Sequence, residues 1–173
     1  MPKANAIPEA EFFHKRYSYD RETGELISLA TGKPITRKSL NGYLSVYRHV
    51  NGKKIHIHVS RIIWVMEYGS IPVDMEIDHI DMDKTNNRLK NLRLCTPSEN
   101  CRNKKVKKKT SILPKGVTKD GRSIRKNPYV VTITGDEKRH YIGRFKDEKS
   151  AAIAYNKASK KYHGQFGRKA AVE

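Results

Sequence analysis

Three polar residues between positions 78 and 100 have the types and the spacing to cut a phosphodiester bond. Asp78 and His79 are adjacent, and Asn100 lies in a segment that begins with helix-starting residues. Histidine can deprotonate a water molecule near neutral pH, and a hard divalent cation can neutralise the charge that develops on the leaving oxygen. Mg²⁺ prefers oxygen ligands and keeps several waters, so one carboxylate and one amide can supply its protein ligands. We therefore predict His79 as a general base and Asp78 and Asn100 as ligands of Mg²⁺, with Mn²⁺ as an alternative metal.

These residues need a compact set of elements to position them. Residues 75–81 alternate between apolar and polar side chains, which predicts a short strand, and residues 89–95 predict its partner strand. Adjacent strand residues point to opposite faces, so Asp78 and His79 are expected on different faces. Residues 96–99 (Thr-Pro-Ser-Glu) form a helix start, because proline suits the first helical position and a capping box surrounds it. The predicted order is strand, loop, strand and helix.

A calcium-binding loop is a rival interpretation of this segment. Asp81, Asp83 and Thr85 begin like the ligand series of an EF-hand. However, Asn86 stands where that loop requires glycine, and Leu92 stands where it requires glutamate. The flanking helices are also missing from the predicted elements, so we reject this interpretation.

Composition favours a polyanionic partner. The 173 residues include 36 Lys and Arg against 18 Asp and Glu, which gives a formal net charge of +18. Such a charge increases both affinity and encounter rate for nucleic acid. The two cysteines, Cys95 and Cys101, are too few for a disulfide framework or a four-thiolate zinc site. Without a signal peptide or a membrane-length apolar segment, we expect an intracellular protein with no membrane contact, not secreted, and in the host cytoplasm if it is phage-encoded.

The first third of the chain predicts a short helix and two hairpins that form a small antiparallel sheet. The helix covers residues 10–17, and the hairpin turns lie at residues 22–24 (Glu-Thr-Gly) and 51–52 (Asn-Gly), between alternating runs. A second helix is expected between Ser60 as its N-cap and Gly69 as its stop.

Two histidines, His56 and His58, alternate along the second hairpin and face the same side. Such a pair could bind zinc, but no third ligand of suitable type lies nearby in the sequence. The favoured role is packing, or a hydrogen bond that steadies the neighbouring Asp78–His79 pair.

A second unit follows a basic run at residues 102–109 that has no acidic residue. We expect this run to serve as a hinge and to neutralise backbone phosphates. Beyond it, residues 116–119, 129–134 and 139–145 predict three strands. A helix is expected to follow at about residues 147–163, with several alanines on one face that allow close packing on a sheet.

The residues around Asp78 resemble the HNH endonucleases, also called ββα-metal nucleases, and are close to the phage-type homing members. The family pattern runs Asp-His-x-Asp, then an Asp- and Asn-rich loop, then Asn-Arg-x-x-Asn-Leu-Arg, and ends in a Thr-Pro-x-x-Asn helix start. The resemblance implies that His79 is the general base, that Asp78 and Asn100 bind the metal, and that Asn91 braces the loop and holds His79 in place. This sequence departs from the pattern at Asn100, where other members have histidine, and at Met82, where relatives usually have glycine.

The last third resembles the plant ethylene-response-factor (APETALA-type) DNA-binding domain, which also occurs fused to phage HNH nucleases. The resemblance covers roughly residues 115–169 and rests on Gly116-Val117, Tyr-Ile-Gly-Arg-Phe at 141–145 and Ser-Ala-Ala-x-Ala-Tyr at 150–155. It implies that the sheet enters the major groove, where arginine can read guanine, although which arginine does so is left open. Tyr129 stands where the family usually has tryptophan. Across the chain, the residues expected to contact DNA are Arg93, Arg102, Lys104, Lys105, Lys107, Arg122, Arg125, Tyr129, Arg139, Tyr141 and Arg144.

Together these patterns predict an α+β chain with two modules. A nuclease domain at 8–103 combines a small antiparallel sheet with a ββα-metal core, a basic linker covers 104–114, and a DNA-binding domain at 115–170 packs a three-stranded sheet on one helix. The predicted function is a Mg²⁺-dependent homing or nicking endonuclease that acts as a monomer on double-stranded DNA, without a small-molecule cofactor. The alternatives are a catalytically inactive, sequence-specific DNA-binding regulator and an RNA-binding protein.

Overall fold

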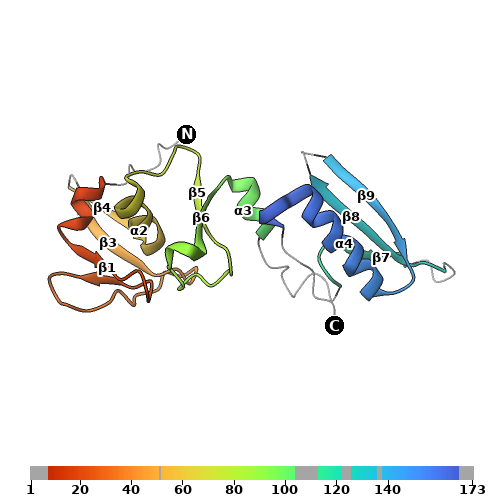
Figure 1. Cartoon of the computed structure of the whole chain (residues 1–173), viewed down its shortest axis with the longest axis horizontal. Coiled ribbons are helices and arrows are strands. Elements are labelled where there is room, and N and C mark those ends of the chain that lie inside the picture. The colour runs from red at the N-terminus through yellow and green to blue at the C-terminus, as the bar shows by residue number, and fades with distance from the viewer. Residues whose placement is uncertain (1–7, 51, 104–112, 122–125, 136–137, 168–173) are drawn as a thin grey trace. The chain divides into compact units, whose positions relative to one another are not determined.

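The computed structural model describes residues 8–50, 52–103, 113–121, 126–135 and 138–167, and the chain forms two compact units, Met1–Pro97 and Ser98–Glu173 (Figure 1). Both units combine helices with small antiparallel sheets, which confirms the predicted α+β class. The nuclease domain, linker and DNA-binding domain limits stay predictions. Among the described helices, none has the length and apolar character needed to cross a membrane.

Two hairpins form much of the first unit. Their strands are β1 (Tyr17–Tyr19), β2 (Leu26–Ser28), β3 (Ser45–Val50) and β4 (Lys53–His58). β1 pairs with β2 and β3 pairs with β4, as predicted, but within the described residues the pairs remain two separate two-stranded sheets where a single sheet was expected. The hairpins meet through buried side chains instead of backbone hydrogen bonds, because Leu26, Val46 and Ile57 belong to one core cluster.

The first helix, α1 (Ala10–His14), begins where predicted but ends early. Tyr17, expected as its last residue, already pairs with Ser28 in β1 and is 2% exposed. Burial of this tyrosine in the strand therefore overrides the local helical pattern.

The second helix, α2 (Val59–Tyr68), corrects the prediction that Ser60 is its N-cap. His58 occupies the N-cap position without a side-chain cap, and Ser60 is buried inside the first turn. The chain passes directly from β4 into α2, which leaves no loop in which a capping residue could sit. Gly69 ends the helix as predicted, with a φ of 82° that suits glycine.

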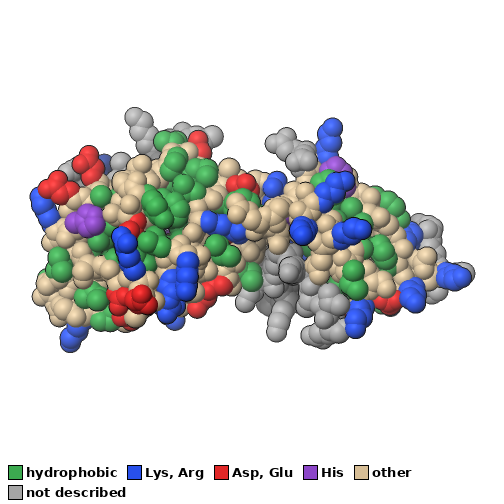
Figure 2. Space-filling model, viewed as in Figure 1, with side chains coloured by type: hydrophobic (Ala, Val, Ile, Leu, Met, Phe, Trp, Pro, Cys, Tyr) green, Lys and Arg blue, Asp and Glu red, His purple; other side chains and the backbone are tan. Residues whose placement is uncertain are grey.

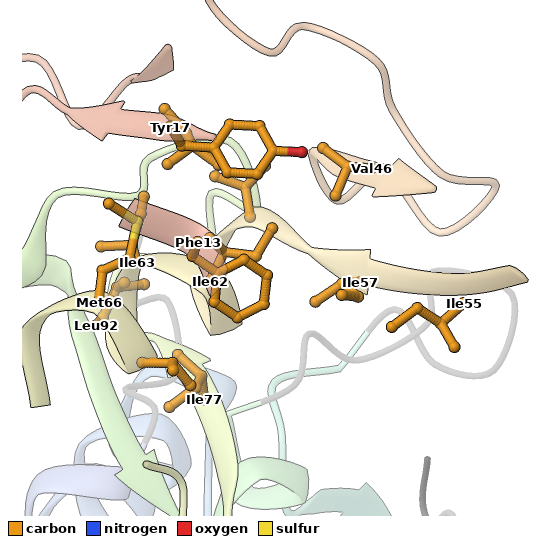
Figure 3. Close-up of a cluster of buried hydrophobic side chains, with 13 residues drawn as sticks. Phe13, Tyr17, Val46, Ile55, Ile57, Ile62, Ile63, Met66, Ile77 and Leu92 are labelled. Atoms are coloured by element: carbon orange, nitrogen blue, oxygen red, sulfur yellow. The ribbon is translucent and has the colours of Figure 1, made fainter. Parts of the chain in front are cut away.

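A single core connects these elements to the strands that carry the candidate site. Figure 3 shows buried side chains from both helices, both hairpins and two later strands converging in one cluster. Phe13, Ile62 and Ile63 are fully buried, and Ile77 and Leu92 join them. Burying each such side chain contributes about 1.5–3 kcal/mol. Because Ile77 precedes Asp78 and Leu92 precedes Arg93, the core fixes the position of both polar neighbours.

The candidate site lies on a short antiparallel pair. β5 (Glu76–His79) pairs with β6 (Leu92–Cys95), with Asp78 opposite Arg93 and His79 opposite Leu92. The partner strand was expected from residue 89, but Leu89–Asn91 form a 3₁₀ turn and the strand starts at Leu92. α3 (Pro97–Asn103) then begins at Pro97, as predicted.

The second unit contains the predicted three-stranded sheet and its helix. The elements are β7 (Val117–Lys119), β8 (Tyr129–Gly135), β9 (Lys138–Phe145), α4 (Glu148–His163) and the 3₁₀ turn Gly164–Phe166. The strands are antiparallel in the order β7-β8-β9, and α4 packs against this sheet (Figure 1). Asp147 caps α4 by accepting a hydrogen bond of 2.7 Å from the Ser150 backbone N–H.

Close helix–sheet packing explains three small residues of the second unit. Ala151, Ala158 and Tyr155 of α4 are buried against Val131 and Ile133 of β8. Gly116 has a φ of 74°, and a Cβ at this position would collide with the Tyr155 ring. Glycine is therefore required where the chain enters β7.

Candidate active site

Asp78 and His79 are buried side by side on β5. Asp78 is 6% exposed and His79 is 3% exposed, although both carry polar side chains. Consecutive strand residues point to opposite faces, so each side chain has its own set of partners. Buried polar groups need hydrogen-bond partners, and the partners of these two define what the site can do.

The partner of Asp78 is Arg93, directly opposite on β6. Nε and Nη2 of Arg93 donate to the same carboxylate oxygen, Oδ2, at 2.9 and 2.7 Å. The side chains are 12% exposed for Arg93 and 7% for Asp78, so this is a buried ion pair. Arg93 was predicted to contact DNA. In the structure Arg93 forms an ion pair with Asp78, a predicted metal ligand. A contact between Arg93 and DNA stays a prediction.

His79 is held by Asn87, a residue to which we assigned no role from the sequence. Nε2 of His79 lies 3.0 Å from Oδ1 of Asn87, which is 1% exposed. Nδ2 of Asn87 donates to the Thr85 carbonyl, which sets the orientation of the amide and turns its oxygen towards the ring. An amide oxygen only accepts, so Nε2 carries the hydrogen, and the lone pair of the neutral ring lies on Nδ1.

Asn91 braces the loop between the two strands. Its Nδ2 donates to Asp81 Oδ1 at 2.9 Å and to the Asn86 carbonyl at 2.7 Å, while its Oδ1 accepts from the Asp81 backbone N–H at 3.0 Å. Burial acts to raise the pKa of Asp81, but hydrogen bonds from Asp83, Asn86 and Asn91 lower it. The bracing bonds are thus seen in the structure, whereas it is Asn87 that makes a side-chain hydrogen bond with His79. The catalytic role of Asn91 stays a prediction.

The first hairpin, β1–β2, also holds this loop in place through hydrogen bonds. The Tyr19 hydroxyl donates to the Asn87 carbonyl at 3.3 Å and accepts from the Leu89 N–H at 3.1 Å. Nε of Arg88 donates to the Glu22 carbonyl at 2.7 Å. Gly24 has a φ of 80°, and a Cβ at this position would lie only 2.6 Å from the backbone nitrogen of Arg88. The hairpin therefore approaches too closely for a larger residue, and it fixes the backbone that carries Asn87.

Tyr43, which we did not select from the sequence, lies beside His79 and connects it to His58. Tyr43 approaches the His79 ring with a centroid separation of 5.8 Å and stacks on His58 at 4.5 Å. Burial, followed by the nearby charges of His56, Arg61 and other cations, lowers the pKa of His58 to about 4. His58 is therefore neutral at neutral pH, and the packing role predicted for this histidine is confirmed.

The comparisons with known proteins agree with this geometry. The HNH endonuclease family matches residues 57–102, which include β5, the loop, β6 and most of α3. Protein 3.8 of Escherichia phage T7 is 33% identical over 61% of this chain and 84% of its own length. The chain therefore contains an HNH endonuclease domain, which includes residues 57–102. An uncharacterized HNH endonuclease of Acanthamoeba polyphaga mimivirus, L560, is 36% identical over 65% of this chain and 56% of its own length, so this chain spans little more than half of that relative.

One solved structure is also similar to this chain. It describes DNA binding and cleavage by the HNH homing endonuclease I-HmuI, and it aligns over 90% of both chains with 20% sequence identity and a TM-score of 0.45.

The third position of the HNH signature, Asn100, lies on α3 and belongs to the second unit. Its amide oxygen and the Asp78 carboxylate are hard donors of the kind that Mg²⁺ takes. Within the described part of the chain, no cluster of three or more His, Cys, Asp or Glu side chains could hold a metal. Metal binding by Asp78 and Asn100 stays a prediction.

The DNA-contact residues predicted for the second unit occupy different environments. Arg139, Tyr141 and Arg144 pair with Thr134, Thr132 and Val130 of β8, on the sheet face opposite Val131 and Ile133 and hence away from α4. Tyr141 is 63% exposed, and Arg139 is also exposed. Arg144 forms an ion pair of 2.9 Å with Asp120. These three side chains therefore share the helix-free face.

Tyr129 lies apart from that face. It packs against the helix-side core, and its hydroxyl donates to Glu148 at 3.3 Å. Arg102 lies on α3, where its carbonyl accepts a hydrogen bond from Nζ of Lys115. The remaining predicted contacts, Lys104, Lys105, Lys107, Arg122 and Arg125, lie outside the described residues.

Removing one member of the buried ion pair should destabilise the first unit. We expect Arg93→Leu to lower the free energy of unfolding by roughly 3–5 kcal/mol, because it leaves the buried Asp78 carboxylate without this partner. Replacing both residues by leucine should recover much of the loss. Urea unfolding of both variants measures the effect, with Lys90→Leu, an exposed cation on the adjacent turn, as the control. A loss for Arg93→Leu no larger than that of Lys90→Leu would contradict the buried-pair interpretation.

Removing the Asn87 side chain should release the His79 ring. We expect Asn87→Ala to cost about 1–3 kcal/mol of folding free energy and to produce a mixture of ring tautomers, since Nε2 loses its acceptor. Nitrogen chemical shifts of ¹⁵N-labelled histidine measure the tautomer, and Asn41→Ala, at an exposed position, is the matched control. An unchanged Nε2–H tautomer in Asn87→Ala would show that another contact fixes the ring.

Proposed function

We propose that this chain is a Mg²⁺-dependent DNA endonuclease of the phage homing or nicking type. The observation that carries the proposal is the environment of His79, a buried imidazole whose Nε2 is held by Asn87 and whose strand neighbour is a carboxylate. This arrangement lies inside the segment that matches the HNH endonuclease family. The viral relative L560 is named as an HNH endonuclease, which supports the same reaction class.

The reaction assigned to the site is hydrolysis of a phosphodiester. His79 accepts a proton from water at Nδ1, while the water oxygen forms a bond to phosphorus and the bond from phosphorus to the 3′-oxygen breaks. Asn87 keeps Nε2 protonated, so that Nδ1 remains the basic atom. Asp78 and Asn100 would hold Mg²⁺, and Asn91 maintains the loop between the strands. The bound metal ion would supply positive charge for the leaving oxygen.

DNA is the proposed substrate because the chain is strongly basic. The formal net charge is +18, and Lys and Arg side chains appear over both units on the face shown in Figure 2. We propose that the second unit is the ethylene-response-factor-like module that holds double-stranded DNA. Its exposed sheet face, with Arg139 and Tyr141, supports this role, since cations neutralise phosphates and arginine can read guanine. With one site per chain, a monomer is expected to nick one strand.

The deciding experiment is plasmid nicking. Supercoiled plasmid is incubated with wild type and His79→Ala in Mg²⁺, Mn²⁺ or EDTA, with His14→Ala on α1 as the matched control. We expect nicking by wild type and control in either metal, none in EDTA, and a rate roughly 10²–10⁴-fold lower for His79→Ala, because the general base is lost.

Two outcomes would contradict the proposal. Equal nicking by wild type and His79→Ala would remove His79 from the mechanism. DNA binding without nicking in any metal would support the alternative of a catalytically inactive, sequence-specific DNA-binding regulator.

A further inference from the structure

A continuous row of aromatic rings leads from an exposed hairpin surface to His79. Tyr47 of β3 and His56 of β4 are cross-strand partners with ring centroids 4.8 Å apart. His56 lies 5.2 Å from His58, His58 stacks on Tyr43 at 4.5 Å, and Tyr43 lies 5.8 Å from His79. We call these five side chains the ring track. Every step along it is a direct ring contact.

Exposure falls along the ring track. Tyr47 is 38% exposed and His56 is exposed, while Tyr43 and His58 are half-buried. His79, at the inner end, is 3% exposed. The ring track therefore runs from the exposed surface of the hairpin to the buried candidate general base.

Cations accompany the rings. The guanidinium carbon of Arg37 lies 4.6 Å from the Tyr47 ring centroid, and Nζ of Lys54 lies 5.0 Å from the same centroid. Nζ of Lys84 lies 4.6 Å from the centroid of Tyr43. Cation–π contacts of this kind orient the charges beside the ring faces.

The hairpin that carries the outer end of the ring track has no acidic residue in its sequence. The sequence contains no Asp or Glu between Glu25 and Glu67, a stretch that supplies both strands of the hairpin. Arg37 and Lys54 are exposed and form no ion pair with an acidic side chain among the described residues. Packing alone would explain the rings but not these uncompensated charges, which suit a polyanion.

We propose that the ring track is the binding surface for the DNA strand to be cut. The phosphates of the strand pair with Arg37 and Lys54, and its sugars lie against Tyr47 and His56 as the strand approaches His79. Cations beside aromatic faces are the combination by which proteins hold a nucleic-acid strand without reading its sequence. The end point of the track at His79 rests on the proposed endonuclease function, whereas the binding surface itself does not.

Binding is measured first, in EDTA, with a short fluorescent duplex of mixed sequence over a series of salt concentrations. We expect the double variant Arg37→Gln and Lys54→Gln to bind roughly tenfold or more weakly and to lower the slope of log affinity against log salt by about 2, since each phosphate contact contributes about 0.9. The control is Lys15→Gln with Arg16→Gln, two exposed cations at the end of α1, which should leave both quantities unchanged.

The ring contribution is tested at Tyr47. Tyr47→Leu should weaken binding severalfold, whereas Tyr47→Phe keeps the ring face and should bind like wild type. Thermal unfolding of each variant separates loss of the surface from loss of the hairpin. If Tyr47→Leu is less stable but binds normally at a temperature where it is folded, the ring is structural only and the proposal is wrong.

Crosslinking then locates the strand. Tyr47 is replaced by the photoreactive residue benzoylphenylalanine, which retains a ring, and the adduct is mapped on a nicked plasmid. The path from Tyr47 to His79 has four steps of 4.5–5.8 Å, which corresponds to about six nucleotides or fewer at 3.4 Å per nucleotide. We expect adducts on the cut strand within that distance of the nick, and none from the same residue placed at Lys15.

The outcomes separate this proposal from the proposed function. Nicking by wild type, together with normal binding and salt slope in the Arg37 and Lys54 variants, would overturn the ring track alone. Absence of nicking with a reduced salt slope in those variants would overturn the endonuclease and support the surface. Absence of DNA binding by wild type would overturn both.

Discussion

The hydrogen bond between Nε2 of His79 and Oδ1 of Asn87 is the contact on which the candidate site depends. It defines which ring nitrogen carries the hydrogen, and hence which nitrogen can act as a base. Asn87 can make this bond only because its loop is fixed from both sides. Asn91 holds the loop from within through Asp81, and Tyr19 holds it from the first hairpin. A hairpin distant in the sequence thus takes part in setting the chemistry of His79.

The second constraint is electrostatic. A carboxylate that is 6% exposed must be compensated, and Arg93 provides two charge-assisted hydrogen bonds to one of its oxygens. The core residues Ile77 and Leu92 place these two side chains opposite each other on paired strands. Asp78 is therefore oriented by the fold and by Arg93, which is the preorganisation that its proposed role as a metal ligand requires.

The sequence predicted the elements of the site better than its contacts. Alternation identified the strand of Asp78 and His79, and the Thr-Pro-Ser-Glu segment located the start of α3, because both signals are local. The bond from Asn87 and the pairing of Arg93 depend on how the loop and strands close, which no local pattern encodes. Asn87 is the first residue of the Asn-Arg-x-x-Asn-Leu-Arg part of the family pattern. The pattern therefore pointed to this position, but it did not indicate that Asn87 binds His79. At Ser60 the local signal was wrong. Serine is a good N-cap residue, but here it is buried in the first turn of α2 and His58 occupies the N-cap position.

The central claim is that His79 is the base that drives DNA cleavage. It is tested most directly by measuring kcat/KM for plasmid nicking against pH and, in the same buffer and Mg²⁺, the titration of His79 by ¹⁵N chemical shift. The pH dependence of kcat/KM reports the essential base of the free enzyme. The account predicts that activity rises with pH with the same midpoint as loss of the proton from Nδ1 of His79. Activity that rises at a pH where His79 does not titrate would contradict it.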